Sequence, residues 1–342
     1  MMILFVQIPT TCAIETSNQD KALTFLTDVA QLDMSLYTVK LVQHDESFPP
    51  HLKGLSFESI IYDLYWKNES LLHITFTFID NKFDICNILP TKGSPIYAEP
   101  QATKPIDSVK DILDRYLTYS QAVYIKNMQA VLNKVDSTNA TATFGDVKLV
   151  TSTMKTPQGT TYEIFEWIYT IDGIDVQPNN LTVYFEDGVF KSLSDKWGLF
   201  KLGSSSVNIS QEEAIDIAKK AANAHTLLVW RGEWVEIPFN LGDELSVNFF
   251  TYPRGEDLTV FPLWDIELYF DKADSLVNGL RYGIWADTGE IAFCNELSYG
   301  GESIGEVTSP TLQSDGSDVL ILVVLAVIVA VVVASTVVLW KK

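Results

Sequence analysis

The stretch VLILVVLAVIVAVVVASTVVLW, residues 319–340, runs for 22 residues without a charge. At about 1.5 Å per helical residue it would span about 33 Å, enough to cross the hydrocarbon core of a bilayer. Only a helix satisfies its own backbone in lipid, and a soluble protein rarely buries a helix that is apolar on every side. The stretch therefore predicts one transmembrane helix, with a buried core helix as the alternative.

The flanks of this stretch predict its orientation. Lys341 and Lys342 follow it directly, whereas Asp315 and Asp318 precede it. Because basic flanks stay in the cytoplasm, we expect a single-pass protein of the cell membrane with a cytoplasmic C-terminus and an extracytoplasmic bulk. Residues 298–318 contain four Gly and five Ser and are expected to form a flexible stalk.

The N-terminal stretch MMILFVQIPTTCA, residues 1–13, resembles the end of an export signal. An apolar run precedes Pro9, and Thr11 and Ala13 have the spacing of a cleavage site. A basic region is missing before the apolar run. We interpret residues 1–13 as a signal-peptide remnant, with a buried first strand as the alternative.

Composition limits the classes of protein and of partner. The chain has 342 residues, of which 47% are hydrophobic and 12% aromatic, so it can bury packed cores and is not disordered. Its formal net charge of −20 repels polyanions. We therefore expect no nucleic-acid partner.

The order of predicted elements repeats three times. Residues 18–32 have apolar side chains at helical spacing, and strand-like runs follow, as in the alternation of Leu72, Ile74, Phe76 and Phe78 with polar residues. After the proline-rich residues 90–107, Ser108 is expected to cap a long second helix, and strands follow again. We therefore predict α+β units at residues 18–100, 105–203 and 204–297, each a helix followed by an antiparallel meander.

Short signals mark turns and a helix start. Asp172-Gly173 and Asp187-Gly188 predict tight hairpins, because those turns need positive φ. Ser210-Gln211-Glu212-Glu213 has the pattern of a capping box, which satisfies free amides at a helix start.

The third unit resembles the PepSY module. The segments that carry the resemblance are VNISQEEAIDIA (207–218), PLWDIEL (262–268) and WADTGEI (285–291). Residues 161–197 are similar to a diverged copy. The resemblance implies tandem units of one helix packed on an antiparallel β-meander, and it implies modules that are not catalytic and that accompany secreted peptidases or stand on cell surfaces.

Alternation along the strands of the third unit predicts a contact face. Trp264, Ile266, Leu268 and Phe270 are expected to face the helix of their unit. The opposite face then carries Glu267, Tyr269, Arg281 and Trp285, where a tryptophan and an arginine are typical anchors of an interface. Two readings of Trp285 stay open: packing against a neighbouring unit, or binding of a partner.

No motif of the chain supports catalysis or a cofactor. Ser303 in a G-x-S-x-G match lies in the expected stalk with every His before it, and Ser152 in an S-x-x-K match lies in a strand pattern. The four His residues, at positions 44, 51, 73 and 225, are isolated, so no zinc-site spacing occurs. We predict a non-enzymatic protein that needs no cofactor and no metal.

Cysteines and sequons supply the remaining candidates. Cys86 and Cys294 are candidates for a disulfide in an oxidising exterior, although two buried thiols are the favoured reading. The sequence contains four candidate glycosylation sites, Asn68, Asn139, Asn180 and Asn208.

Two functions fit these observations. The favoured one is a membrane-anchored, extracytoplasmic protein that binds or restrains a partner protein, for which the resemblance suggests a peptidase. The other is a wall-associated or glycan-binding structural protein. The sequence leaves the oligomeric state open.

Overall fold

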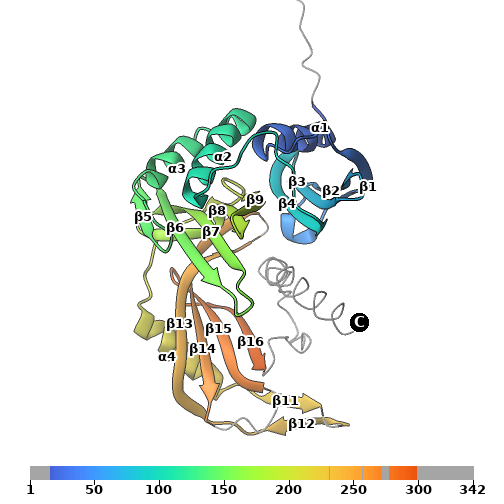
Figure 1. Cartoon of the computed structure of the whole chain (residues 1–342). Coiled ribbons are helices and arrows are strands. Elements are labelled where there is room, and N and C mark those ends of the chain that lie inside the picture. Colours follow the sequence, from blue (N-terminus) through green and yellow to red (C-terminus); the bar gives the residue numbers. More distant parts are fainter. Residues whose placement is uncertain (1–15, 231, 256, 272–276, 299–342) are drawn as a thin grey trace, which may run out of the picture.

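The computed structural model describes residues 16–230, 232–255, 257–271 and 277–298. The expected signal remnant at 1–13, nearly all of the expected stalk, Ser303 and the expected helix at 319–340 lie outside these residues. The described chain is mostly antiparallel sheet, arranged as one nine-stranded sheet, one five-stranded sheet and a two-stranded ribbon (Figure 1).

The nine-stranded sheet has the order β1-β2-β3-β4-β9-β8-β7-β6-β5, and all neighbours are antiparallel. The chain enters and leaves β8 through the two predicted hairpins, where Asp172-Gly173 and Asp187-Gly188 all have positive φ. The strands are β1 (Thr38–Ser47), β2 (Phe57–Trp66), β3 (Ser70–Ile79), β4 (Lys82–Lys92), β5 (Thr141–Phe144), β6 (Val147–Lys155), β7 (Thr161–Ile171), β8 (Ile174–Glu186) and β9 (Val189–Asp195).

Helices lie along one side of this sheet (Figure 1). They are α1 (Asn18–Thr24), which continues into a π-helical turn η1 (Phe25–Val29), then α2 (Pro105–Ser120) and α3 (Ile125–Leu132). A short 3-10 turn, η2 (Pro50–Leu52), lies between β1 and β2.

The expected long second helix is wrong in two respects. It begins before Ser108, because Pro105 has a fixed helical φ and lacks the N–H that a first helical position leaves unused. It is also two helices, because Gln121 adopts the left-handed conformation with φ of 54° and ends α2. Ser108 is instead a buried residue inside α2.

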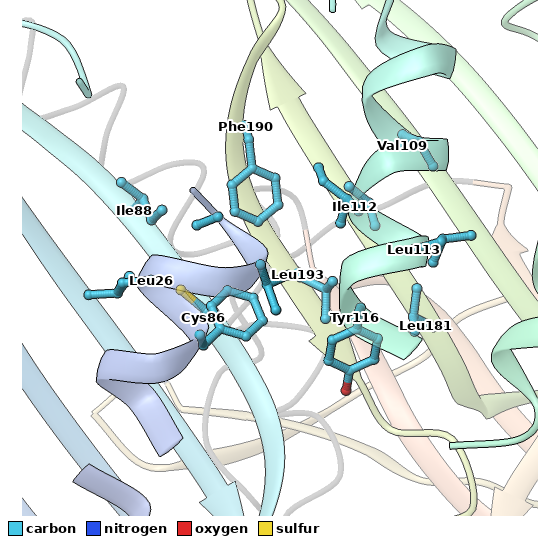
Figure 2. Close-up of a cluster of buried hydrophobic side chains, with 14 of the residues drawn as sticks. Leu26, Cys86, Ile88, Val109, Ile112, Leu113, Tyr116, Leu181, Phe190 and Leu193 are labelled. Carbon is cyan, nitrogen blue, oxygen red and sulfur yellow. The ribbon is translucent and has the colours of Figure 1, made fainter. Parts of the chain in front are cut away.

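One core fills the space between these helices and the sheet. Leu26 from η1 and Cys86 and Ile88 from β4 approach Phe190 and Leu193 from β9, with side chains of α2 beside them (Figure 2). Strands β4 and β9 pair through Ile85–Ser194, Cys86–Leu193 and Asn87–Ser192. The first two predicted units therefore share a sheet and a core.

The third predicted unit forms a five-stranded sheet with its own helix. Its capping box is confirmed: Ser210 Oγ accepts from Glu213 N, and Glu213 accepts from Ser210 N, at the start of α4. The elements are β10 (Lys201–Leu202), α4 (Gln211–Asn223), β13 (Leu241–Pro253), β14 (Thr259–Phe270), β15 (Val277–Trp285) and β16 (Ile291–Ser298), with β11 (Leu227–Trp230) and β12 (Trp234–Ile237) as the separate ribbon.

The core under α4 follows the predicted alternation. Ala214, Ala218 and Ala222 of α4 are fully buried against the sheet. Small side chains let a helix lie close to the strands. The sheet side of this core consists of Ile266, Leu268, Leu280, Tyr282 and Ile284, with Trp264 and Phe270 partly buried at its margin.

The expected fold class of tandem helix-on-meander units is wrong. The meander of residues 18–100 and that of 105–203 join through β4 and β9 into one sheet with shared helices, so no tandem series of equal units exists. Within the described chain no helix is long and apolar enough to cross a bilayer, and the expected helix at 319–340 lies outside the described residues. The longest, α2, has 16 residues and only one buried side.

Candidate contact surface

The four predicted contact residues lie on the side of the five-stranded sheet that faces away from α4. Glu267 and Arg281 are opposite each other on β14 and β15. Glu267, Tyr269 and Arg281 are half-buried, whereas Trp285 is only 8% exposed. The structure thus brings all four onto one face, as the alternation predicts, but it buries the tryptophan.

Arg281 bonds to the carboxylate of Asp265, which the predicted contact face does not include. Its Nε donates to Asp265 Oδ1 at 2.7 Å and its Nη2 to Asp265 Oδ2 at 3.2 Å. Asp265 is 3% exposed, so this forked pair satisfies a carboxylate that burial would otherwise penalise. Arg281 is therefore fixed beside Asp265.

A second arginine explains why Trp285 is buried. The guanidinium of Arg254 lies 3.8 Å from the ring centre of Phe261 and 4.7 Å from that of Trp285. Its two terminal nitrogens donate to the two carboxylate oxygens of Asp287 at 2.9 and 2.6 Å. Cation–π contact and a bidentate ion pair together fix this arginine over the indole.

Two further rings extend the arrangement. Tyr252 lies 6.3 Å from Trp285 and 5.5 Å from Phe293, measured between ring centres. Phe293 covers Gly283, where any Cβ would come within 2.4 Å of the ring. The glycine therefore lets the ring lie close to the backbone. We call Tyr252, Arg254, Phe261, Trp285 and Phe293 the aromatic–arginine cluster.

Beside the cluster, the charge of this face is negative. Arg254 and Arg281 are neutralised by Asp287 and Asp265, respectively. The Tyr269 hydroxyl donates to Glu267 Oε2 at 2.7 Å, and this bond together with burial raises the pKa of Tyr269 to about 12. Glu267 thus remains a negative charge without an ion pair of its own among the described residues.

The signals for the missed residues differ in kind. Asp265 shares the parity of Glu267 and Tyr269, so alternation along β14 could have found it. Arg254 lies in the loop between β13 and β14, and Asp287 lies in the turn between β15 and β16, so only the fold brings them together. Among the described residues, the ring and cation contacts of Trp285 are Tyr252, Phe261 and Arg254, all from its own unit.

The two cysteines lie in different sheets and do not pair. Cys86 on β4 is fully buried, and burial raises the pKa of its thiol well above the ordinary range. Cys294 on β16 is exposed rather than buried. It lies opposite Tyr282 and beside His225, whose Nε2 is 3.9 Å from Glu296 Oε1.

The sequons differ in accessibility. Asn68, Asn139 and Asn208 are exposed, but Asn139 and Asn208 use their side-chain amides in hydrogen bonds to the backbone. Asn180 is half-buried within β8 and donates to Glu166 Oε1 at 2.9 Å. Asn68, in the turn between β2 and β3, is exposed, and its side chain makes no hydrogen bond within the described chain.

The Ser152 match finds no support in the geometry. Ser152 and Lys155 lie three residues apart on β6, so they point to opposite faces. In the described part of the chain, no three His, Cys, Asp or Glu side chains gather as ligands for a metal ion. No protein family matches the chain, and no curated protein matches it in sequence.

Proposed function

We propose that this chain is a non-enzymatic binding protein whose five-stranded sheet holds a partner protein on the side opposite α4. The observation that carries the proposal is the aromatic–arginine cluster beside Glu267. Aromatic and arginine side chains are the usual anchors of interfaces, and here ion pairs hold both arginines in place before binding.

The charge of the face limits which partners would fit it. Glu267 and the nearby Glu244 both raise the pKa of Tyr269, so this margin of the face is acidic. The whole chain carries −20. A partner that presents a basic side chain next to an apolar one would match Glu267 and Phe293 at once. The resemblance to PepSY modules suggests a secreted peptidase as the partner.

The test measures binding to purified secreted peptidases. Glu267→Lys should weaken binding at least tenfold, because it places a positive charge against the basic side chain of the partner. Asp216→Lys is the matched control, since Asp216 is exposed on α4 on the other side of the same sheet. Equal binding by both variants, or no binding to any peptidase by the unchanged protein, would contradict the proposal.

One observation favours the second candidate, glycan binding. Tyr162 and Tyr184 lie side by side on the nine-stranded sheet, with ring centres 5.9 Å apart and planes at 20°. Both are half-buried, so they form a flat platform on which a sugar ring could stack. Retention on cell-wall polysaccharide that is lost on Tyr184→Ala, with no peptidase binding, would establish this function instead.

A further inference from the structure

The first strand of the nine-stranded sheet forms a long open edge. β1 pairs with β2 on one side, and no strand of the described chain pairs with its other side. All ten of its residues are exposed. The opposite edge, β5, has only four residues. An edge of ten residues presents a row of unpaired backbone N–H and C=O groups, which can pair with another strand.

Several side chains on and beside this edge strand are apolar although they are exposed to solvent. Val39, Leu41 and Val42 are 38%, 43% and 47% exposed, and Leu36 and Phe48 beside the strand are 43% and 65% exposed. Single exposed apolar residues are ordinary, but a contiguous group on a sheet edge marks an interaction site.

A bulge fixes where the charges of the edge point. Leu41 pairs with Tyr62 and Gln43 with Ile61, so Val42 is an extra residue that shifts the alternation. As a result Lys40 and Asp45, which lie opposite Asp63 and Ser59, point to the same face although they are five residues apart. Within the described chain Lys40 makes no ion pair.

The charges of two β1 strands complement each other only when the strands run antiparallel. When a second β1 lies antiparallel, with Thr38 of one strand against Ser47 of the other, Lys40 of each chain comes beside Asp45 of the other on the same face. A parallel arrangement would place Lys40 beside Lys40 and Asp45 beside Asp45. Opposite charges across a strand pair are favourable, and like charges are unfavourable.

We propose that β1 pairs antiparallel with β1 of a second copy of this chain and joins two nine-stranded sheets edge to edge. The contact is isologous, so the same residues serve both copies. Lysine and a bulge on an edge normally oppose indiscriminate pairing. Here the lysine and the bulge favour one partner strand, because the charge of Lys40 is stabilised only where the neighbouring strand places a carboxylate beside it.

The test exchanges charges between two differently tagged full-length chains, kept in non-ionic detergent because residues 319–340 are uncharged and apolar. Co-purification of the two tags measures pairing. Lys40→Asp and Asp45→Lys should each reduce self-pairing about tenfold, because each places two pairs of like charges in the contact. A mixture of the Lys40→Asp chain with the Asp45→Lys chain should restore pairing, since every contact then joins opposite charges.

The restored mixture also shows that both variants fold. Thr143→Lys on the other edge, β5, is the matched control and should pair like the unchanged chain. The proposal is overturned if the unchanged tags do not co-purify, if the single variants pair as well as the unchanged chain, or if their mixture fails to pair. Binding of an unrelated protein to β1 without self-pairing overturns it as well.

Discussion

At the scale of single residues, the buried carboxyl group of Asp195 depends on the hydrogen bonds that its neighbours donate. It is 8% exposed, and its Oδ2 accepts from the hydroxyls of Tyr116 at 2.6 Å and Tyr124 at 2.5 Å. Burial raises the pKa of Asp195, and these hydroxyls oppose the increase. The two tyrosines come from α2 and its connection to α3, so the carboxyl group ties that region to the end of β9.

Removing one of these hydroxyls should destabilise the fold. Tyr116→Phe leaves the buried carboxylate one donor short and should lower the free energy of unfolding by about 1–3 kcal/mol, measured by urea denaturation. Tyr119→Phe is the control, because the Tyr119 hydroxyl donates only to the Lys21 carbonyl at 3.2 Å. Equal losses in the two variants would show that Asp195 does not depend on Tyr116.

His225 makes a contribution to stability that depends on pH. The Cys294 thiol and the Glu296 carboxylate raise its pKa to about 9, against an opposing effect of burial. The unfolded chain has a His pKa of about 6.5, so the folded state holds its proton more tightly. The gain is therefore complete below about pH 6.5 and is lost as pH rises to about 9.

His225→Gln should remove this gain. Its free energy of unfolding should lie below that of the unchanged protein at pH 6, by at most about 3 kcal/mol, and the difference should fade by pH 9. Denaturation curves at three pH values measure the difference. A difference that stays constant from pH 6 to pH 9 would mean that the proton on His225 plays no part.

At the scale of elements, β14 and β15 have one face packed against α4 and an opposite face that we propose as a contact surface. One tryptophan lies on each face. Trp264 donates through Nε1 to the Ile209 carbonyl at 2.8 Å, just before α4. Trp285 lies on the other face under Arg254. Each truncation to Ala should cost about 3 kcal/mol, because each removes a large ring from a packed site.

Hydrogen exchange should separate the two variants. Trp264→Ala should speed exchange in α4, residues 211–223, because it frees the approach to the helix. Trp285→Ala should leave α4 protected and weaken partner binding. If Trp285→Ala exposed α4 and Trp264→Ala did not, the assignment of the two faces would be reversed.

Elements could be predicted from the sequence where the signal is local. Alternation placed β3 and β14, and the Asp-Gly pairs placed both hairpins, because side-chain periodicity and positive φ are properties of a few neighbouring residues. The break between α2 and α3 was missed, because Gln121 adopts a left-handed φ that its residue type does not announce. The four predicted contact residues do share one face of the sheet, and Arg254 was missed because its partners Trp285 and Asp287 are remote in sequence.

At the scale of the whole molecule, the pairing of β4 with β9 decides the architecture. Residues 85–87 pair with residues 192–194, about a hundred positions later in the chain. Each strand has the same alternation whether it ends a small sheet or continues a large one, so periodicity carries no information on this choice. The sequence therefore predicted two separate units at 18–100 and 105–203, where the molecule has one sheet and one core across both.

The shared core predicts that the two halves of the nine-stranded sheet unfold together. Leu193 is fully buried on β9 and pairs with Cys86 on β4. Leu193→Ala should cost about 2–5 kcal/mol and should speed hydrogen exchange in β2 and β3 as much as in β6 and β7, because both halves pack on that side chain's core. Ile266→Ala, in the separate core under α4, should leave exchange in β2 and β3 unchanged. If Leu193→Ala loosened only β6 and β7, the halves would be independent units that merely touch.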